Sequence, residues 1–162
     1  MLIKSRKIET TTENLGISIY NPTAIYNIVK VCNPYCPPCA KSHPILEEMV
    51  NNGKINLQIL FTASSSTDKK GKVVSHLLAI DEFGKNQTQK ALDDWYLADI
   101  KDYEIFANKY SMNGELTQQE HKIRAMHSWC QKENITHTPT IFINGFEIPK
   151  EYSVDDLKDI LQ

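Results

Sequence analysis

The sequence predicts an α/β fold with a mixed central sheet, in the order strand, helix, strand, a helical insertion, two strands and a last helix. Three observations predict it. A β-branched and aromatic run at 25–31 leads directly into two prolines, which can open a helix. A second apolar run at 55–63 completes a parallel strand–helix–strand unit. A late hairpin pattern at 140–148 adds antiparallel strands.

The first part of the chain reads as a tether followed by the parallel unit. Residues 1–24 are polar and weakly patterned, and we interpret them as an N-terminal tether with a short edge strand at 17–20. The strand at 25–31 should be buried, and a helix should run from 37 to about 51. The apolar run at 55–63 indicates a central parallel strand.

The second part contains a helical insertion and the hairpin. Apolar faces at helical spacing recur through 68–134, and Thr117 with Glu120 predicts a capping box for the last of these helices. Strands at 140–144 and 146–148 should flank a turn, and Ser153 should cap a short final helix.

Bulk composition excludes several classes of protein. Among 162 residues, 41% are hydrophobic and 23% are charged, which is ordinary for a globular protein. The net charge of −2 gives no argument for nucleic acid or an anionic membrane as a partner. The sequence has no apolar run of about 18 residues, and its first residues do not resemble a signal peptide. We therefore expect either a cytoplasmic protein or the soluble part of a longer exported or membrane-anchored one.

Cys36, Pro37, Pro38 and Cys39 form the motif with the clearest chemistry. A thiol at the start of a helix is close to the positive end of the helix dipole, which favours the reactive thiolate. The spacing places a second thiol one turn into the helix, where it can close a disulfide. We expect Cys36 to be exposed and to attack, and Cys39 to be buried and to resolve the mixed disulfide. The alternatives are incidental core thiols or half of a zinc site.

Cys36-x-Pro38-Cys39 followed by Pro44 resembles the thioredoxin superfamily, as does Thr138-Pro139-Thr140 before the next strand. The resemblance covers 25–162 and implies a thioredoxin-like domain. It implies that Pro139 is cis and packs against the disulfide, while the backbone of Thr138 binds a substrate chain. We expect Pro37 and Pro38 to line the same substrate-binding surface.

Two further likenesses concern partners and location. The insertion at 68–134 resembles that of periplasmic disulfide oxidoreductases of the DsbA type. The strings CNPYCPPCAKSHP and TPTIFINGFEIP are similar to thioredoxin-like domains fused to vitamin K epoxide reductase-like membrane proteins in some bacteria. They imply a periplasmic or otherwise extracytoplasmic protein with protein thiols and disulfides as substrates. A membrane-embedded, quinone-linked redox partner, either separate or on the same parent chain, is the further implication. Neither an organic cofactor nor a metal is implied.

The motif departs from the family in two ways. Two consecutive prolines remove two N–H groups from the first turn, so we expect weaker hydrogen bonding to a Cys36 thiolate. Lys30 lies six residues before Cys36, where relatives often have a buried acid. We expect its side chain to reach solvent. Alternatively, its charge would favour a thiolate.

Four other residues carry weaker signals. Cys32 and Cys130 are expected to be buried thiols that behave as small hydrophobes, with a second disulfide or an electron relay as alternatives. His43 should be half-exposed. His137 either borders the substrate groove or reflects ordinary loop polarity.

We therefore expect thiol–disulfide exchange with protein thiols, in a direction that the sequence does not reveal. One alternative is a metal carrier that binds through Cys36 and Cys39, with Cys32 or His43. The spacing Cys-x3-Cys-x2-Cys also occurs in radical S-adenosylmethionine enzymes, which need a larger barrel. A redox-inert binding module is the third alternative, and the intact Cys-x-x-Cys argues against it.

Overall fold

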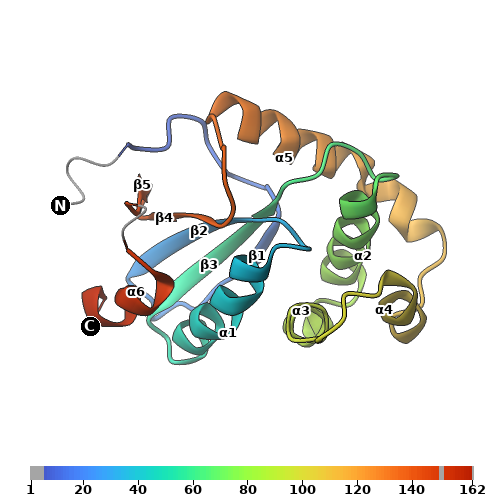
Figure 1. Cartoon of the computed structure of the whole chain (residues 1–162), viewed down its shortest axis with the longest axis horizontal. Helices are drawn as coiled ribbons and strands as arrows, with labels where there is room; N and C mark the ends of the chain where they lie inside the picture. Colours follow the sequence, from blue (N-terminus) through green and yellow to red (C-terminus); the bar gives the residue numbers. More distant parts are fainter. Residues whose placement is uncertain (1–5, 150–151, 162) are drawn as a thin grey trace.

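A five-stranded mixed sheet with helices on both faces accounts for most of the computed structural model, which describes residues 6–149 and 152–161 (Figure 1). In chain order the elements are β1 (Ile17–Ile19), β2 (Tyr26–Cys32), α1 (Pro37–Asn51), β3 (Ile55–Phe61), α2 (Lys69–Phe83), η2 (Lys85–Gln87), α3 (Thr88–Tyr96), α4 (Tyr103–Lys109), η3 (Gly114–Gln119), α5 (Glu120–Lys132), β4 (Thr140–Ile143), β5 (Phe146–Glu147) and α6 (Val154–Ile160). The expected α/β order is confirmed.

The sheet order is β1-β3-β2-β4-β5, which places β2 at the centre. β2 runs parallel to β3, with Cys32 opposite Phe61. β2 runs antiparallel to β4, with Val31 opposite Thr140. The end of β2, from which α1 follows, therefore lies beside the start of β4. This register brings the Cys36–Cys39 motif and the Thr138–Thr140 motif together at one end of the central strands.

The helices divide into three groups around the sheet (Figure 1). α1 and α6 cover one face and α5 covers the other, while α2, α3 and α4 lie beside them. α1 has the predicted bounds. It begins at Pro37 because the fixed φ of proline suits the first position of a helix. Within the described residues, no helix has the length and apolar character needed to cross a membrane.

The β4–β5 hairpin and the start of α6 follow the predicted turn chemistry. Asn144 and Gly145 have φ values of 49° and 89°, as a tight two-residue hairpin requires. Ser153 caps α6 in a reciprocal capping box with Asp156.

The predicted capping box at Thr117 and Glu120 is wrong. Thr117 lies inside η3, and its hydroxyl donates to Gly114 O at 2.9 Å. Glu120 begins α5, but its carboxylate accepts the backbone N–H of Ser66 at 2.9 Å. The Glu120 carboxylate therefore accepts from a backbone N–H in a distant loop and not from the start of its own helix.

The described part of the expected tether is packed against the domain. Ile8 N–H donates to Gly145 O at 2.8 Å, beside the hairpin. The Trp129 indole N–H donates to Thr10 O at 2.8 Å. Residues 6–16 therefore connect α5 with the β4–β5 hairpin.

Candidate active site

Cys36 and Cys39 occupy the first turn of α1, as predicted. Cys36 is the N-cap, with φ −87° and ψ 121°, and Pro37 and Pro38 are the first two helical residues. Cys36 is partly exposed, whereas Cys39 is fully buried. The exposures fit one thiol that meets a partner and one that stays behind it.

The loop before β4 reaches the Cys36 sulfur. Cys36 Sγ lies 3.5 Å from the carbonyl oxygen of Thr138, 102 residues further along the chain. The Thr138–Pro139 peptide bond is cis. The sheet register explains the meeting, since Val31 and Thr140 are paired directly behind these segments.

The turn that presents Cys36 is fixed from two sides. Cys36 N–H donates to Asn33 O at 3.1 Å, and Tyr35 N–H donates to the Asn33 side chain at 2.9 Å. The Trp95 indole N–H, from the insertion, donates to Pro34 O at 2.7 Å. No N–H of α1, which the structure describes throughout, donates to the Cys36 sulfur. The expected loss of N–H donors at the start of α1 is therefore observed.

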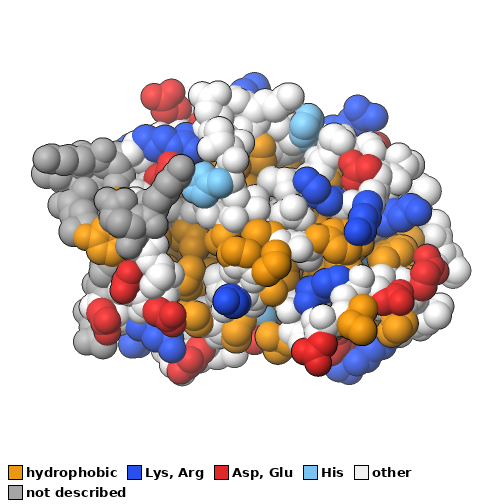
Figure 2. Space-filling model, viewed as in Figure 1, with side chains coloured by type: hydrophobic (Ala, Val, Ile, Leu, Met, Phe, Trp, Pro, Cys, Tyr) orange, Lys and Arg blue, Asp and Glu red, His pale blue; other side chains and the backbone are white. Residues whose placement is uncertain are grey.

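A groove of about 400 Å³ lies beside Cys36, between the start of α1, the cis-proline loop and α6. Hydrophobic side chains gather in a band across this face of the molecule, over the start of α1 (Figure 2). The groove is lined by Pro38, Lys41, Ser42, Ile45, His137, Thr138, Pro139, Ile141, Ile148, Pro149, Tyr152, Ser153, Val154 and Asp155. His137 therefore borders the groove.

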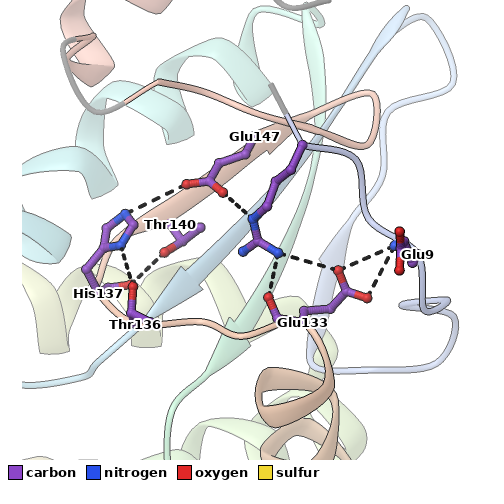
Figure 3. Close-up of polar contacts among 7 residues, drawn as sticks. Glu9, Glu133, Thr136, His137, Thr140 and Glu147 are labelled. Carbon is purple, nitrogen blue, oxygen red and sulfur yellow. Dashed lines mark hydrogen bonds and ion pairs between the residues drawn. The ribbon is translucent and has the colours of Figure 1, made fainter. Parts of the chain in front are cut away.

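The N-terminal segment braces the base of this loop (Figure 3). Arg6 pairs with the Glu147 carboxylate and donates to Glu133 O. The buried Glu133 carboxylate accepts the backbone N–H groups of Glu9 at 3.2 Å and Thr10 at 2.8 Å. Because a buried carboxylate needs such donors, Glu133 joins the N-terminal segment to the end of α5.

The same network reaches the cis-proline loop (Figure 3). His137 Nε2 lies 4.0 Å from the Glu147 carboxylate, and the Thr140 hydroxyl donates to His137 O at 2.6 Å. These contacts fix the backbone on both sides of Thr138.

The expectation that Lys30 reaches solvent is wrong. Its side chain is 1% exposed, because β2 is flanked by strands on both edges and covered by helices. Lys30 Nζ donates to Cys39 O at 3.0 Å and lies 5.2 Å from the Tyr96 ring centre. The alternative is supported: a positive charge lies beside the buried thiols.

Cys32 and Cys39 are neighbouring buried thiols behind Cys36, close enough for each to influence the ionisation of the other. Burial raises the pKa of Cys32, but the neighbouring Cys39 thiol, the Lys30 charge and the Tyr96 hydroxyl together lower it to about 6. The neighbouring Cys32, and then burial, raise the pKa of Cys39. The first proton therefore leaves the pair easily and the second does not.

His43 is buried, not half-exposed as expected. It is 2% exposed, stacks on Tyr96 at 5.4 Å, and its Nε2 is hydrogen-bonded to Asp93 at 2.7 Å. Burial lowers the pKa of His43, and the Asp93 bond offsets this only in part. Burial, followed by the nearby Asp93, raises the pKa of Glu47 to about 7.

The cluster formed by His43, Glu47 and Asp93 has ligand atoms spaced as a metal site requires. In the part of the chain that the structure describes, His43, Glu47 and Asp93 are the group whose ligand atoms all lie within 4.8 Å of one another. The sulfurs of Cys32, Cys36 and Cys39 do not form such a group. The residue set of the metal-carrier alternative is therefore not gathered at one point.

Sequence reasoning missed Tyr96, Trp95 and Glu133 as parts of the site. Tyr96 and Trp95 come from the insertion, some 60 residues after the motif, and their pattern shows only a packed helix face. The one feature of the local sequence that indicated a buried polar environment was Lys30, a charged residue inside a largely apolar strand.

Comparisons with known proteins agree with the fold. The Thioredoxin family model matches residues 12–162. Oxidised BdbD from Bacillus subtilis superposes with a TM-score of 0.70 at 14% identity, over 97% of this chain and 96% of that one. A periplasmic thioredoxin-like protein from Salmonella enterica serovar Typhimurium gives 0.68 at 15%, over 89% and 86%. Reduced DsbA from Mycobacterium tuberculosis gives 0.66 at 12%, over 88% and 89%. No curated protein matches the sequence.

Proposed function

We propose, from the premise that this chain belongs to the thioredoxin family, that it catalyses thiol–disulfide exchange with protein substrates through Cys36 and Cys39. One observation carries the proposal most directly. The half-exposed Cys36 sulfur lies 3.5 Å from the backbone of Thr138, with the buried Cys39 one turn behind it.

The exchange proceeds in two steps. The Cys36 thiolate attacks one sulfur of a substrate disulfide, and the other substrate sulfur leaves as a thiolate. Cys39 then attacks Cys36 Sγ in the mixed disulfide, which frees the substrate and leaves a Cys36–Cys39 disulfide. Oxidation of a substrate dithiol is the same pair of steps in reverse. The direction depends on the redox poise of the compartment.

The groove beside Cys36 suits an extended substrate chain. Thr138 and Pro139 would bind the substrate backbone next to the reacting sulfur, and Pro38 would form the opposite border. Pro37, which was expected to share this surface, is exposed and does not line the groove. The lining is largely apolar and includes the charged side chains of Lys41 and Asp155. Such a surface favours unfolded or extended segments over a small polar thiol.

Location and partner form a finer part of the proposal. The Salmonella neighbour is described as periplasmic, and we place this protein outside the cytoplasm as well. A membrane-embedded, quinone-linked protein would then restore the disulfide, either separately or on the same parent chain.

Reduction of insulin disulfides by dithiothreitol tests the activity. Wild type should accelerate insulin precipitation, and Cys36→Ser should lower the rate at least about 100-fold because the nucleophile is gone. Cys130→Ala is the matched control, since it removes a buried thiol on α5 and should retain the wild-type rate. Full activity of Cys36→Ser would contradict the proposal.

A further inference from the structure

A third thiol lies directly behind the active-site pair. Cys32 ends β2, Cys39 lies in the first turn of α1, and both side chains are fully buried. The Cys39 thiol packs with Cys32 and Cys36 in one cluster and is close enough to each for it to influence the ionisation of Cys39. The three sulfurs do not all lie within 4.8 Å of one another. Cys39 is therefore the middle member of a row of three sulfurs.

The surroundings of Cys32 differ from those of an inert core thiol. Lys30 Nζ, itself buried, lies within 3.0 Å of Cys39 O. The Tyr96 hydroxyl is buried and finds no conventional hydrogen-bond partner among the described residues, yet it lies close enough to Cys32 to favour its thiolate. Burial alone raises the pKa of Cys130 to about 11. A thiol that served only as a small hydrophobe would need neither Lys30 nor Tyr96.

We propose that Cys32 is a third redox-active cysteine, which exchanges with the Cys36–Cys39 disulfide to form a buried Cys32–Cys39 disulfide and release Cys36. The proposal rests on the exchange activity proposed above. The Cys32 sulfur attacks Cys39 Sγ, the Cys36–Cys39 bond breaks, and its electron pair leaves on Cys36. The proton given up by Cys32 is taken up by Cys36. The chain contains one disulfide before and after the step, so no oxidant or reductant is consumed.

This isomer changes what the oxidised protein presents to partners. The disulfide moves from the half-exposed Cys36 into the core, away from soluble thiols. Cys36 becomes a free nucleophile while the chain still stores one disulfide. An oxidised molecule could then attack a second, incorrect disulfide in a substrate, as an isomerase does.

A variant with only two thiols tests the bond itself. In Cys36→Ser/Cys130→Ala, oxidised glutathione should close an intramolecular Cys32–Cys39 disulfide. Both thiols should disappear from a count in denaturant, and the mass should fall by about 2 Da. Adding Cys32→Ala gives the matched control, in which Cys39 should remain a thiol or carry glutathione. Two persistent thiols, or a glutathione adduct, in the two-thiol variant would overturn the proposal.

Alkylation tests the exchange in a chain that keeps all three cysteines of the row. Native oxidised wild type, treated with iodoacetamide, should carry label on Cys36, and Cys32→Ala should lose it. Cys130→Ala should label like wild type. Cys32, Cys36 and Cys39 share the tryptic peptide 31–41, so fragment sequencing assigns the label. Label equally abundant in oxidised Cys32→Ala would contradict the relay.

The insulin assay separates this inference from the proposed function. An active wild type whose two-thiol variant fails to close the bond overturns the relay and leaves the exchange activity standing. A closed Cys32–Cys39 bond in a chain without insulin activity supports the pairing and overturns the proposed function.

Discussion

Lys30 is the residue that most changes the electrostatics beneath the active-site helix. Its buried ammonium bonds to Cys39 O and favours ionisation of the neighbouring Cys32. The folded pKa of Cys32, about 6, lies below its ordinary value of 9.0. This thiolate therefore contributes stability above pH 9.0, and the contribution is lost as pH falls through about 6.

Replacing Lys30 should raise the pKa of the Cys32–Cys39 pair. In a Cys36→Ser/Cys130→Ala background, thiolate absorbance should show a first midpoint near pH 6. Lys30→Gln keeps a donor for Cys39 O but removes the charge, so the midpoint should rise by about 1–2 pH units. Lys41→Gln removes an exposed lysine from α1, the helix that carries Cys39, and should leave the midpoint unchanged. An unaltered midpoint in Lys30→Gln would contradict the assigned role.

At the scale of single elements, the start of α1 decides how far the helix can support a Cys36 thiolate. An N-cap side chain ordinarily accepts from the N–H of the second or third helical residue. Pro38 is the second residue and has no N–H, which leaves Cys39 as the nearest donor. The helix dipole still favours a Cys36 thiolate, but hydrogen bonding from the first turn of α1 is reduced.

Pro38→Ala should restore the missing donor. One cap hydrogen bond contributes about 1 kcal/mol, so alkylation of Cys36 by iodoacetamide at mildly acidic pH should accelerate about fivefold. Pro37→Ala is the matched control, because the N–H it restores belongs to the first helical residue, which is not the usual cap donor. Equal acceleration in both variants would point to backbone flexibility instead of the cap.

At the scale of the whole molecule, the sequence could predict the order of elements and the meeting of its two motifs. Local patterns specify each strand and helix, and the β2–β4 pairing then brings Thr138 to Cys36. The burial of Lys30 and His43 could not be predicted, because Tyr96 and Asp93 come from an insertion whose docking has no local signature. The brace at Glu133 joins segments 123 residues apart or more, beyond any local pattern.

Trapping a mixed disulfide tests the central claim most directly. Reduced Cys39→Ser, mixed with insulin, should form a covalent complex through Cys36, because nothing resolves it. Dithiothreitol should release the complex, and Cys36→Ser/Cys39→Ser should not form it. If no complex forms, or if it joins insulin through Cys32 or Cys130, Cys36 is not the attacking thiol and the account is wrong.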